Sequence, residues 1–319
     1  MIRIQVAIVA LLVAAAMPAQ AFVRSVTKST RLCLYWPKRE LPFVVNDQGS
    51  RSAPGCTPYS SLLSVRKSFE TWQDVGCTDV RFVSQGITER FDVGMHKDPT
   101  QNINLVVWRP RACADVVPED DPCREGLLKD KSNPDCSNRY NCWMHETRFR
   151  PDAPADVIAL TTVRYVPSTG EIADADIELY DWNQQTGTAA FGKYFTCVDP
   201  GPGVSICREP GEPNCIGMDV QNTMTHEIGH FLGLDHEHAQ ALTSTMATRA
   251  ADGETMKRRL DAETVRGICS VYPDGQMTDT CRAPAKIAGN LDLGCSHGAM
   301  GLTSLVGLAG LLSRRRSRI

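Results

Sequence analysis

The chain has 319 residues, of which 42% are hydrophobic and 22% are charged, and its formal net charge at pH 7 is -3. This composition supplies enough apolar residues for a sizeable core, which excludes a mostly disordered chain or a collagen-like repeat. The small net charge gives no reason to expect a nucleic acid as partner. The unusual feature is 13 cysteines without any CxxC pair, a pattern that favours disulfides formed in an oxidising compartment.

The N-terminal residues 1–21 predict an export signal. Arg3 supplies the positive charge, residues 6–16 form an apolar run, and Ala19-Gln20-Ala21 matches the small-x-small pattern of a cleavage site before Phe22. The alternative is an uncleaved membrane anchor, but the apolar run is too short to span a bilayer comfortably. Export to an oxidising compartment agrees with the cysteine content.

The apolar patterns that follow predict an α+β alternation of strands and helices. Ser61–Trp72 carries apolar residues three and four positions apart, which is the spacing of an amphipathic helix. Pro, Ser and Gly at 167–170 predict a hairpin-like connection between two strands. In chain order we expect strand 41–45, helix 61–72, strands 79–83, 102–108, 156–165 and 171–180, and helices 219–232 and 260–272.

Two cysteine-rich segments, at about 109–146 and 195–216, do not fit this alternation. Both are rich in proline or charge and lack periodicity, so we expect long loops stapled by disulfides. A zinc knuckle that includes His145 is the alternative for the first segment. The cysteine spacing and the export signal argue against it, because zinc sites favour ligand pairs two to four residues apart.

The C-terminus carries a second signal, at residues 295–319. Cys295 precedes an apolar segment of about 18 residues, the lower limit for a membrane span, and four arginines follow between 314 and 318. This arrangement resembles the MYXO-CTERM sorting tail, which implies processing near Cys295 and display on the cell surface. A single-pass anchor and a hydrophobic helix that packs on the domain are the alternatives.

Residues 275–294 predict a linker to this tail, with Cys281 tied back to the domain. Without the one positive charge of the signal and the four of the tail, residues 22–294 have a net charge of -8 and an even 12 cysteines. The exported region is therefore acidic, and its cysteines can all pair.

The chemistry concentrates in the sequence HEIGHFLGLDH, which spans 226–236. His226 and His230 are four residues apart and lie on one face of a helix, where they can share a metal ion. Gly233 lets the chain leave the helix and turn, so that His236 can return as a third ligand. Three imidazoles suit zinc and leave its fourth position for water, which Glu227 is placed to touch. The alternative to a metal site is that these three histidines are simply surface residues of an amphipathic helix.

HExxHxxGxxH followed by a methionine is the metzincin signature, and this sequence most resembles the matrixin branch. The methionine is Met246 in Ser244-Thr245-Met246-Ala247, which in the family lies beneath the metal. Residues 170–179 resemble the strand before the active-site helix, so the resemblance covers about 41–274 apart from the two insertions. It implies a peptidase domain at 22–274 with a twisted mixed sheet, an active-site helix and a C-terminal helix.

The resemblance implies a zinc-dependent endopeptidase whose substrate is a protein or peptide. A water on the zinc would be the nucleophile, with Glu227 as general base and then general acid. The substrate would extend along a strand at 157–163, and residues 247–257 would help wall the pocket for the residue after the scissile bond. Asp174 and Asp176 are candidate ligands of a structural calcium ion; two solvated carboxylates on a strand face are the alternative.

The location implied by both ends of the chain is the cell surface, the outer membrane or the medium, with the tail in contact with membrane or sorting machinery. The number of subunits stays open. The rival function is a surface adhesion or scaffold protein that keeps the fold and the zinc without cleaving peptides. A structural zinc module is a second rival, disfavoured by the open fourth position.

Overall fold

The computed structural model describes residues 22–50, 56–124, 135–144, 157–181, 194–208, 212–237 and 243–283. The predicted signal at 1–21, His145 and the predicted tail at 295–319 with Cys295 lie outside these residues. Within the described parts, the protein contains no helix that is both long enough and apolar enough to cross a bilayer.

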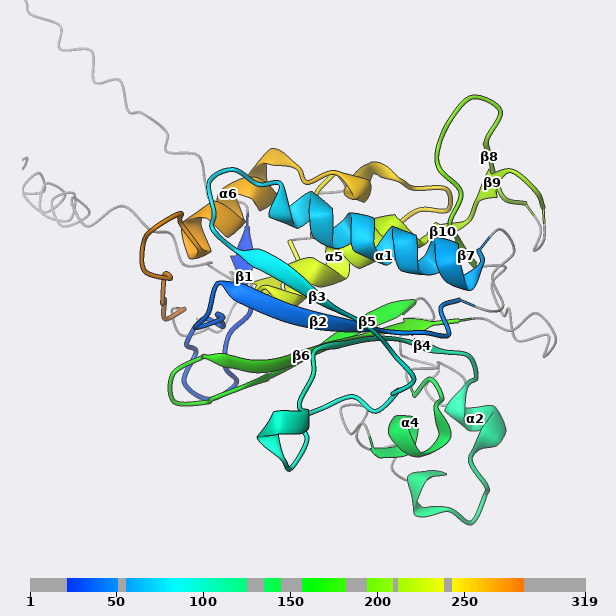
Figure 1. Ribbon diagram of the computed structural model, residues 1–319, viewed down its shortest axis with the longest axis horizontal. Helices are drawn as coiled ribbons and strands as arrows, with labels where there is room; N and C mark the ends of the chain where they lie inside the picture. The colour runs from blue at the N-terminus through cyan, green and yellow to red at the C-terminus, as the bar shows by residue number, and fades with distance from the viewer. Residues whose placement is uncertain are drawn as a thin grey trace, which may run out of the picture.

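A five-stranded sheet in the order β3-β2-β4-β6-β5 forms the centre of the molecule (Figure 1). Four of its strands run parallel, and β5 pairs antiparallel with β6 at one edge. The expected mixed sheet is therefore present. The strands are β2 (Glu40–Asn46), β3 (Arg81–Thr88), β4 (Leu105–Arg109), β5 (Ala159–Tyr165) and β6 (Ile172–Tyr180).

The predicted strands agree with the observed ones in number and order, and the largest difference is at β3. We expected 79–83, whereas β3 extends to Thr88. The additional residues are mostly exposed and polar, because β3 is the other edge of the sheet and only Phe82 is buried in the core. An edge strand of this kind has a weak apolar pattern, so its end is poorly marked in the sequence.

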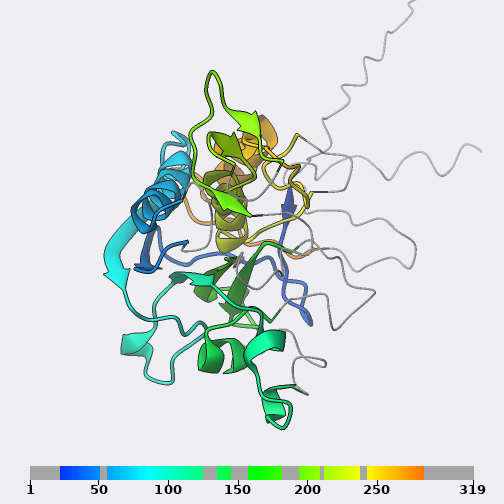
Figure 2. The same ribbon diagram turned by 90° about the vertical axis from the view of Figure 1, so that its right-hand side faces the viewer.

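Three helices cover one face of the sheet: α1 (Pro58–Gln73), α5 (Val220–Phe231) and α6 (Ala262–Val271). Figures 1 and 2 show them on the same side, with α5 between α1 and the sheet edge that carries β5. Each helix begins at a residue whose side chain accepts backbone N–H bonds, namely Thr57, Asp219 and Asp261. Such caps satisfy N–H groups that have no partner within the helix.

The cysteine-rich segments contain short elements in addition to loops. The first holds α2 (Cys113–Val116) and α4 (Asp135–Tyr140), which lie on the face of the sheet away from α5 (Figures 1 and 2). The second holds two short parallel pairs. The remaining elements are β7 (Phe195–Thr196), β8 (Ser205–Ile206), β9 (Cys215–Ile216), β10 (Met218–Asp219), β1 (Val23–Arg24), β11 (Leu234–Asp235), and the 3-10 turns η1 (Pro99–Gln101) and η4 (Met256–Arg258).

All 12 cysteines between 22 and 294 pair, and the zinc-knuckle alternative is therefore wrong. Cys33–Cys281 ties the segment after α6 back to the N-terminal segment, as expected for Cys281. Short bridges close loops inside the insertions, and long ones join distant parts of the chain. The other pairs are Cys56–Cys197, Cys77–Cys269, Cys113–Cys142, Cys123–Cys136 and Cys207–Cys215.

This pairing predicts that the oxidised protein has no reactive thiol within 22–294. Alkylation before reduction should label none of these cysteines, and alkylation after reduction should label all of them. Peptide mapping by mass spectrometry without reduction should recover the six pairs. Several labelled cysteines before reduction, or a bridge between Cys33 and a residue other than Cys281, would contradict the pairing.

Candidate metal centre

Helix α5 carries the first two histidines and is buried along nearly its whole length. Val220, Met224, Ile228 and Phe231 form an apolar stripe along the helix, and each is at most 1% exposed. The indole nitrogen of Trp72 on α1 donates to the carbonyl oxygen of Thr225 at 2.8 Å. This bond fixes the helix against α1 one residue before His226.

Both ends of α5 are held by side chains from elsewhere in the chain. At its start, Asp219 accepts the N–H of Asn222 at 2.7 Å and receives two bonds from the guanidinium of Arg258. At its end, the indole of Trp36 donates to the carbonyl of Phe231 at 2.7 Å. The hydroxyl of Tyr272 donates to the carbonyl of Leu232 at 2.8 Å. These bonds satisfy polar groups that a buried helix end would otherwise leave without partners.

Two glycines let the chain pass close to its neighbours around the centre. Gly233 has φ +88°, and a Cβ there would lie 2.7 Å from the carbonyl oxygen of Leu34. Only glycine adopts this conformation at low cost, so the predicted turn out of the helix is confirmed. At Gly229, a Cβ would overlap the sulfur of Met246 and lie 2.9 Å from its methyl carbon. Met246 is 1% exposed and packs directly against the helix between the two histidines.

His236 reaches the centre because β11 is pinned by the N-terminal segment. β11 pairs antiparallel with β1, with Arg24 opposite Leu234. The N–H of Ser25 donates to the carbonyl of Gly233 at 2.9 Å, and its hydroxyl lies 3.1 Å from the carbonyl of Leu234. The turn after α5 therefore has a fixed path, and His236 follows directly from it.

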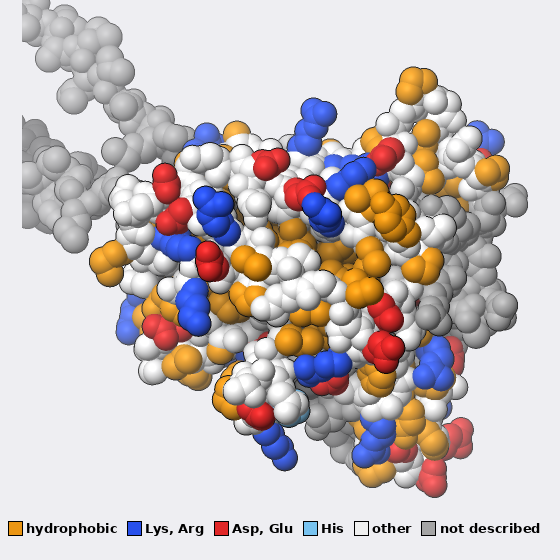
Figure 3. Space-filling view, in the orientation of Figure 1, with side chains coloured by type: hydrophobic (Ala, Val, Ile, Leu, Met, Phe, Trp, Pro, Cys, Tyr) orange, Lys and Arg blue, Asp and Glu red, His pale blue; other side chains and the backbone are white. Residues whose placement is uncertain are grey.

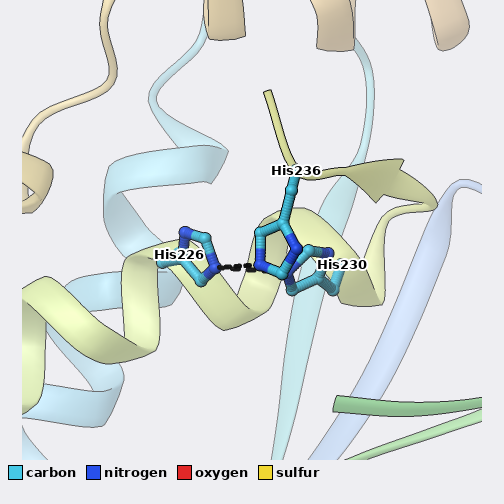
Figure 4. A group of neighbouring side chains, drawn as sticks. All are labelled: His226, His230 and His236. Carbon is cyan, nitrogen blue, oxygen red and sulfur yellow. Dashed lines mark hydrogen bonds between the residues drawn. The ribbon is translucent and has the colours of Figure 1, made fainter. Parts of the chain in front are cut away.

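The three imidazoles turn toward one another, as Figure 4 shows. Their Nε2 atoms are 3.1 Å apart for His226–His230, 3.1 Å for His230–His236 and 3.3 Å for His226–His236. Three nitrogens that each lie about 2.0–2.1 Å from a tetrahedral zinc ion would be roughly 3.3–3.4 Å apart. The separations agree with this geometry to within a few tenths of an ångström.

The protonation of the rings also suits a cation. Nδ1 of His226 lies 2.7 Å from the carbonyl oxygen of Thr245, and Nδ1 of His230 lies 2.9 Å from that of Leu234. A carbonyl oxygen only accepts, so each Nδ1 carries the proton and each neutral ring turns its Nε2 lone pair to the centre. Burial lowers the pKa of His226 well below its usual range, and it also lowers the pKa of His230 and His236. The neutral rings that a metal needs are thus favoured.

Glu227 lies beside this centre and is 6% exposed. Burial raises its pKa to about 7, against smaller lowering effects from the Thr161 hydrogen bond and from the electrostatic influence of His236 and Lys257. The hydroxyl of Thr161 on β5 lies 2.6 Å from Oε2 of Glu227 and 3.1 Å from its carbonyl oxygen. Sequence reasoning missed Thr161, because its contact with Glu227 joins residues 66 positions apart.

A cleft of about 810 Å³ opens over the histidines and Glu227. One wall is the edge strand β5 with the residues just before it, so the predicted position of the substrate strand at 157–163 lines the cleft. Residues 247–250 and Lys257, from the segment after Met246, also line the cleft.

Asp174 and Asp176, the calcium candidates, lie on β6 and are fully buried, so the solvated alternative is wrong. Asp176 accepts the N–H groups of Gly94 and Leu105, and Asp174 accepts the amide of Asn102 at 2.9 Å. Burial raises the pKa of both carboxyls. Within the described residues, the histidine triad is the one group of three or more ligand side chains close enough to hold a metal ion. The calcium prediction is therefore not supported.

Residues 131–273 match the family model described as Matrixin. This segment contains β5, β6, α5, the three histidines and Met246, and the match supports a matrixin-like, metzincin-type domain with a catalytic zinc. The mixed α/β content and the disulfides are compatible with such a fold.

The comparisons with curated proteins and with solved structures give no further support for a family or a fold. No curated protein matches the chain. A solved structure titled "GM1 bound form of the ECX AB5 holotoxin" aligns with 79% of this chain and 88% of its own, at 10% identity and a TM-score of 0.36. A TM-score this low does not establish a shared fold.

The contact between Gly229 and Met246 predicts that Gly229→Ala destabilises the protein. Alanine would gain roughly 1 kcal/mol of helix propensity, but overpacking against Met246 and Trp72 costs about 1–3 kcal/mol. We expect a lower free energy of unfolding in urea with the disulfides intact. Gly76→Ala is the matched control, since a Cβ there meets nothing within 4 Å.

The double variant Gly229→Ala, Met246→Ala separates packing from other effects. If the two residues compete for the same space, the double variant loses less stability than the sum of the single variants. Additive losses, or an unchanged stability in Gly229→Ala alone, would show that Met246 does not pack beneath the helix in this way.

Proposed function

We propose that the protein is an exported zinc-dependent endopeptidase that acts at the cell surface. The observation that carries the proposal is the convergence of three histidine Nε2 atoms within 3.1–3.3 Å of one another, beside a buried carboxylate in an open cleft. The Matrixin match supports the zinc peptidase class. Six disulfides support a destination in an oxidising compartment.

His226, His230 and His236 are the proposed ligands, each through Nε2. The zinc ion, when bound, supplies a Lewis acid that polarises the scissile carbonyl and makes a water nucleophilic near neutral pH. The carbonyls of Thr245 and Leu234 hold the rings of His226 and His230 in the ligating tautomer. Met246 supports the helix from below, with its side chain against Gly229.

The substrate binds as an additional strand along β5. Among the described residues, β5 is the last strand in its sheet and pairs with β6 on one side only, so its second edge has backbone groups available toward the cleft. An extended peptide can satisfy these groups while its side chains enter alternate positions. This mode explains an endopeptidase better than an exopeptidase, because the strand continues on both sides of Glu227.

Glu227 performs the proton transfers. It takes a proton from the attacking water and delivers it to the amine that leaves when the peptide bond breaks. Burial raises the pKa of Glu227 to about 7, which suits both steps near neutral pH. The Thr161 hydroxyl occupies Oε2 and thereby fixes the carboxylate. Thr161 is a positioning residue in this scheme.

The rival function is an adhesion or scaffold protein with a bound zinc ion. A zinc site that only binds has no need for a buried carboxylate beside it, and it has no need for a strand edge along an open cleft. Both features favour hydrolysis over the rival. The proposed surface location includes processing at Cys295 and contact of the tail with sorting machinery; these residues lie outside the described parts of the chain.

Cleavage of an unfolded protein tests the function. The oxidised, zinc-loaded protein should cut casein, and a chelator should stop the reaction. Glu227→Gln should keep a stoichiometric zinc ion and lose activity by at least about a hundredfold, because the proton acceptor is gone. His236→Ala should lose both zinc and activity. Zinc is measured by atomic emission, and cleavage by release of soluble peptides.

The two variants also separate the rival from the proposal. A wild type that holds zinc but leaves casein and mixed peptides intact would favour the scaffold. Full activity in Glu227→Gln would exclude the mechanism, and unchanged zinc content in His236→Ala would remove His236 from the ligand set.

The hydrogen bond from Thr161 predicts a loss of turnover when it is removed. Thr161→Val keeps the shape of the side chain but leaves the Glu227 carboxylate without its donor, and we expect kcat to fall about ten- to a hundredfold. KM should change little, because the substrate contacts the backbone of β5. Thr161→Ser should restore most of the activity.

Thr162→Val is the matched control on the same strand, since successive side chains of a strand point to opposite faces. It should leave kcat within about twofold, as expected for a substitution away from the carboxylate. Equal losses in Thr161→Val and Thr162→Val would mean that the strand is damaged, and the role of the hydroxyl would then be unsupported.

A further inference from the structure

One end of the cleft lies on the side from which the leaving amine receives its proton. Thr223 precedes Glu227 by four residues, so the two lie one turn apart on the same face of α5. Asn222 and Thr223 line the cleft from the first turn of α5, whereas Ser25 and Leu34 line it from beside Gly233, in the turn after His230. Since Glu227 protonates the amine, the residue that follows the scissile bond directs its side chain toward the Thr223 end.

The wall of this end carries two positive side chains with different surroundings. Lys257 is 2% exposed, and its ammonium donates to Oε1 of Glu254 at 2.8 Å and to the carbonyl of Arg249 at 2.7 Å. Its charge is therefore compensated within the protein. Arg249 is exposed and lines the cleft, and its guanidinium makes no hydrogen bond or ion pair within the described part of the chain.

The residues that line the cleft differ in charge from the exported region as a whole, because the region is acidic and the cleft is not. Residues 22–294 are acidic, with a net charge of -8, and on the face that α1 covers, both signs of charge are interspersed (Figure 3). Among the residues that line the cleft, Glu227 is the one carboxylate, and it is held by Thr161. Within the described part of the chain, the Thr223 end therefore combines Arg249, whose guanidinium has no ion-pair partner there, with the small side chains of Ala247, Thr248 and Ala250.

We infer that Arg249 selects substrates with an acidic residue directly after the scissile bond. This inference rests on the proposed peptidase function and assigns its substrate class. A guanidinium offers two parallel N–H donors that match a carboxylate. A glutamate side chain can therefore place its methylene groups against the small residues of the wall and its carboxylate on Arg249. A lysine at the same position would meet the like charge of Arg249.

Matched peptides test the inference with the oxidised full-length protein. Three fluorescence-quenched peptides differ only after the scissile bond, where they carry Glu, Gln or Lys. Wild type should show kcat/KM about three- to fivefold higher for Glu than for Gln, the range of an exposed ion pair, and Lys should be the poorest. Arg249→Gln should remove the preference, and Arg249→Glu should invert it toward Lys. Because the pair is exposed, salt should weaken the preference.

Arg81→Glu is the matched control, because it makes the same change of charge on β3, at the opposite edge of the sheet. It should leave the Glu/Gln ratio unchanged. Equal rates on the Glu and Gln peptides in wild type would overturn the inference while the peptidase function stands, and so would a ratio altered equally by Arg81→Glu. If the zinc-loaded wild type cuts neither these peptides nor casein, the proposed function itself fails, and the inference with it.

Discussion

The burial of helix α5 is the constraint on which the rest of the structure depends. A helix in this position has backbone groups at both ends that water does not reach, so the protein must supply their partners. Arg258 and Asp219 serve the first turn, and Trp36 and Tyr272 serve the last carbonyls. These partners come from the N-terminal segment, from η4 and from α6. Segments that are far apart in the sequence therefore hold the helix that presents His226, Glu227 and His230. A metal site needs such support, because the positions of its ligands must be kept to within a few tenths of an ångström.

The third histidine depends on contacts that are more distant still. The turn at Gly233 passes within contact of Leu34, and β11 takes its direction from β1. The N-terminal segment is in turn tied by Cys33–Cys281 to the residues after α6. The N-terminal segment and the residues after α6 are thus joined to each other, and the N-terminal segment pairs with the strand that leads to His236. Without such support, a loop would present this histidine in many orientations. Metal binding would then be weaker, because it would have to offset the conformational entropy lost when the loop becomes ordered.

The local parts of this arrangement could be predicted from the sequence, and the non-local parts could not. The pattern at 226–236 indicates a helix, a glycine turn and three convergent imidazoles, because all of these follow from spacing along a few residues. The stripe from Val220 to Phe231 likewise indicates the buried face. By contrast, the contact of Thr161 with Glu227 and the burial of Asp174 and Asp176 depend on which strands become neighbours. Cysteine spacing indicated that twelve cysteines pair but left open which ones do, since connectivity is a property of the folded chain.

The first cysteine-rich segment supports the sheet from the face opposite the metal centre. Arg109 at the end of β4 is fully buried and donates to Glu178 of β6 at 2.6 Å, and its other donors reach the carbonyl of Ser137 and the side chains of Asn138 and Asn141. A buried guanidinium is tolerated only when its donors are satisfied in this way. The disulfide-stapled segment around α4 is thereby fastened to the face of the sheet away from α5. It braces β6, which holds β5 in register, and none of its described residues lines the cleft. The proposed peptide-binding strand β5 is thereby supported on the side that pairs with β6.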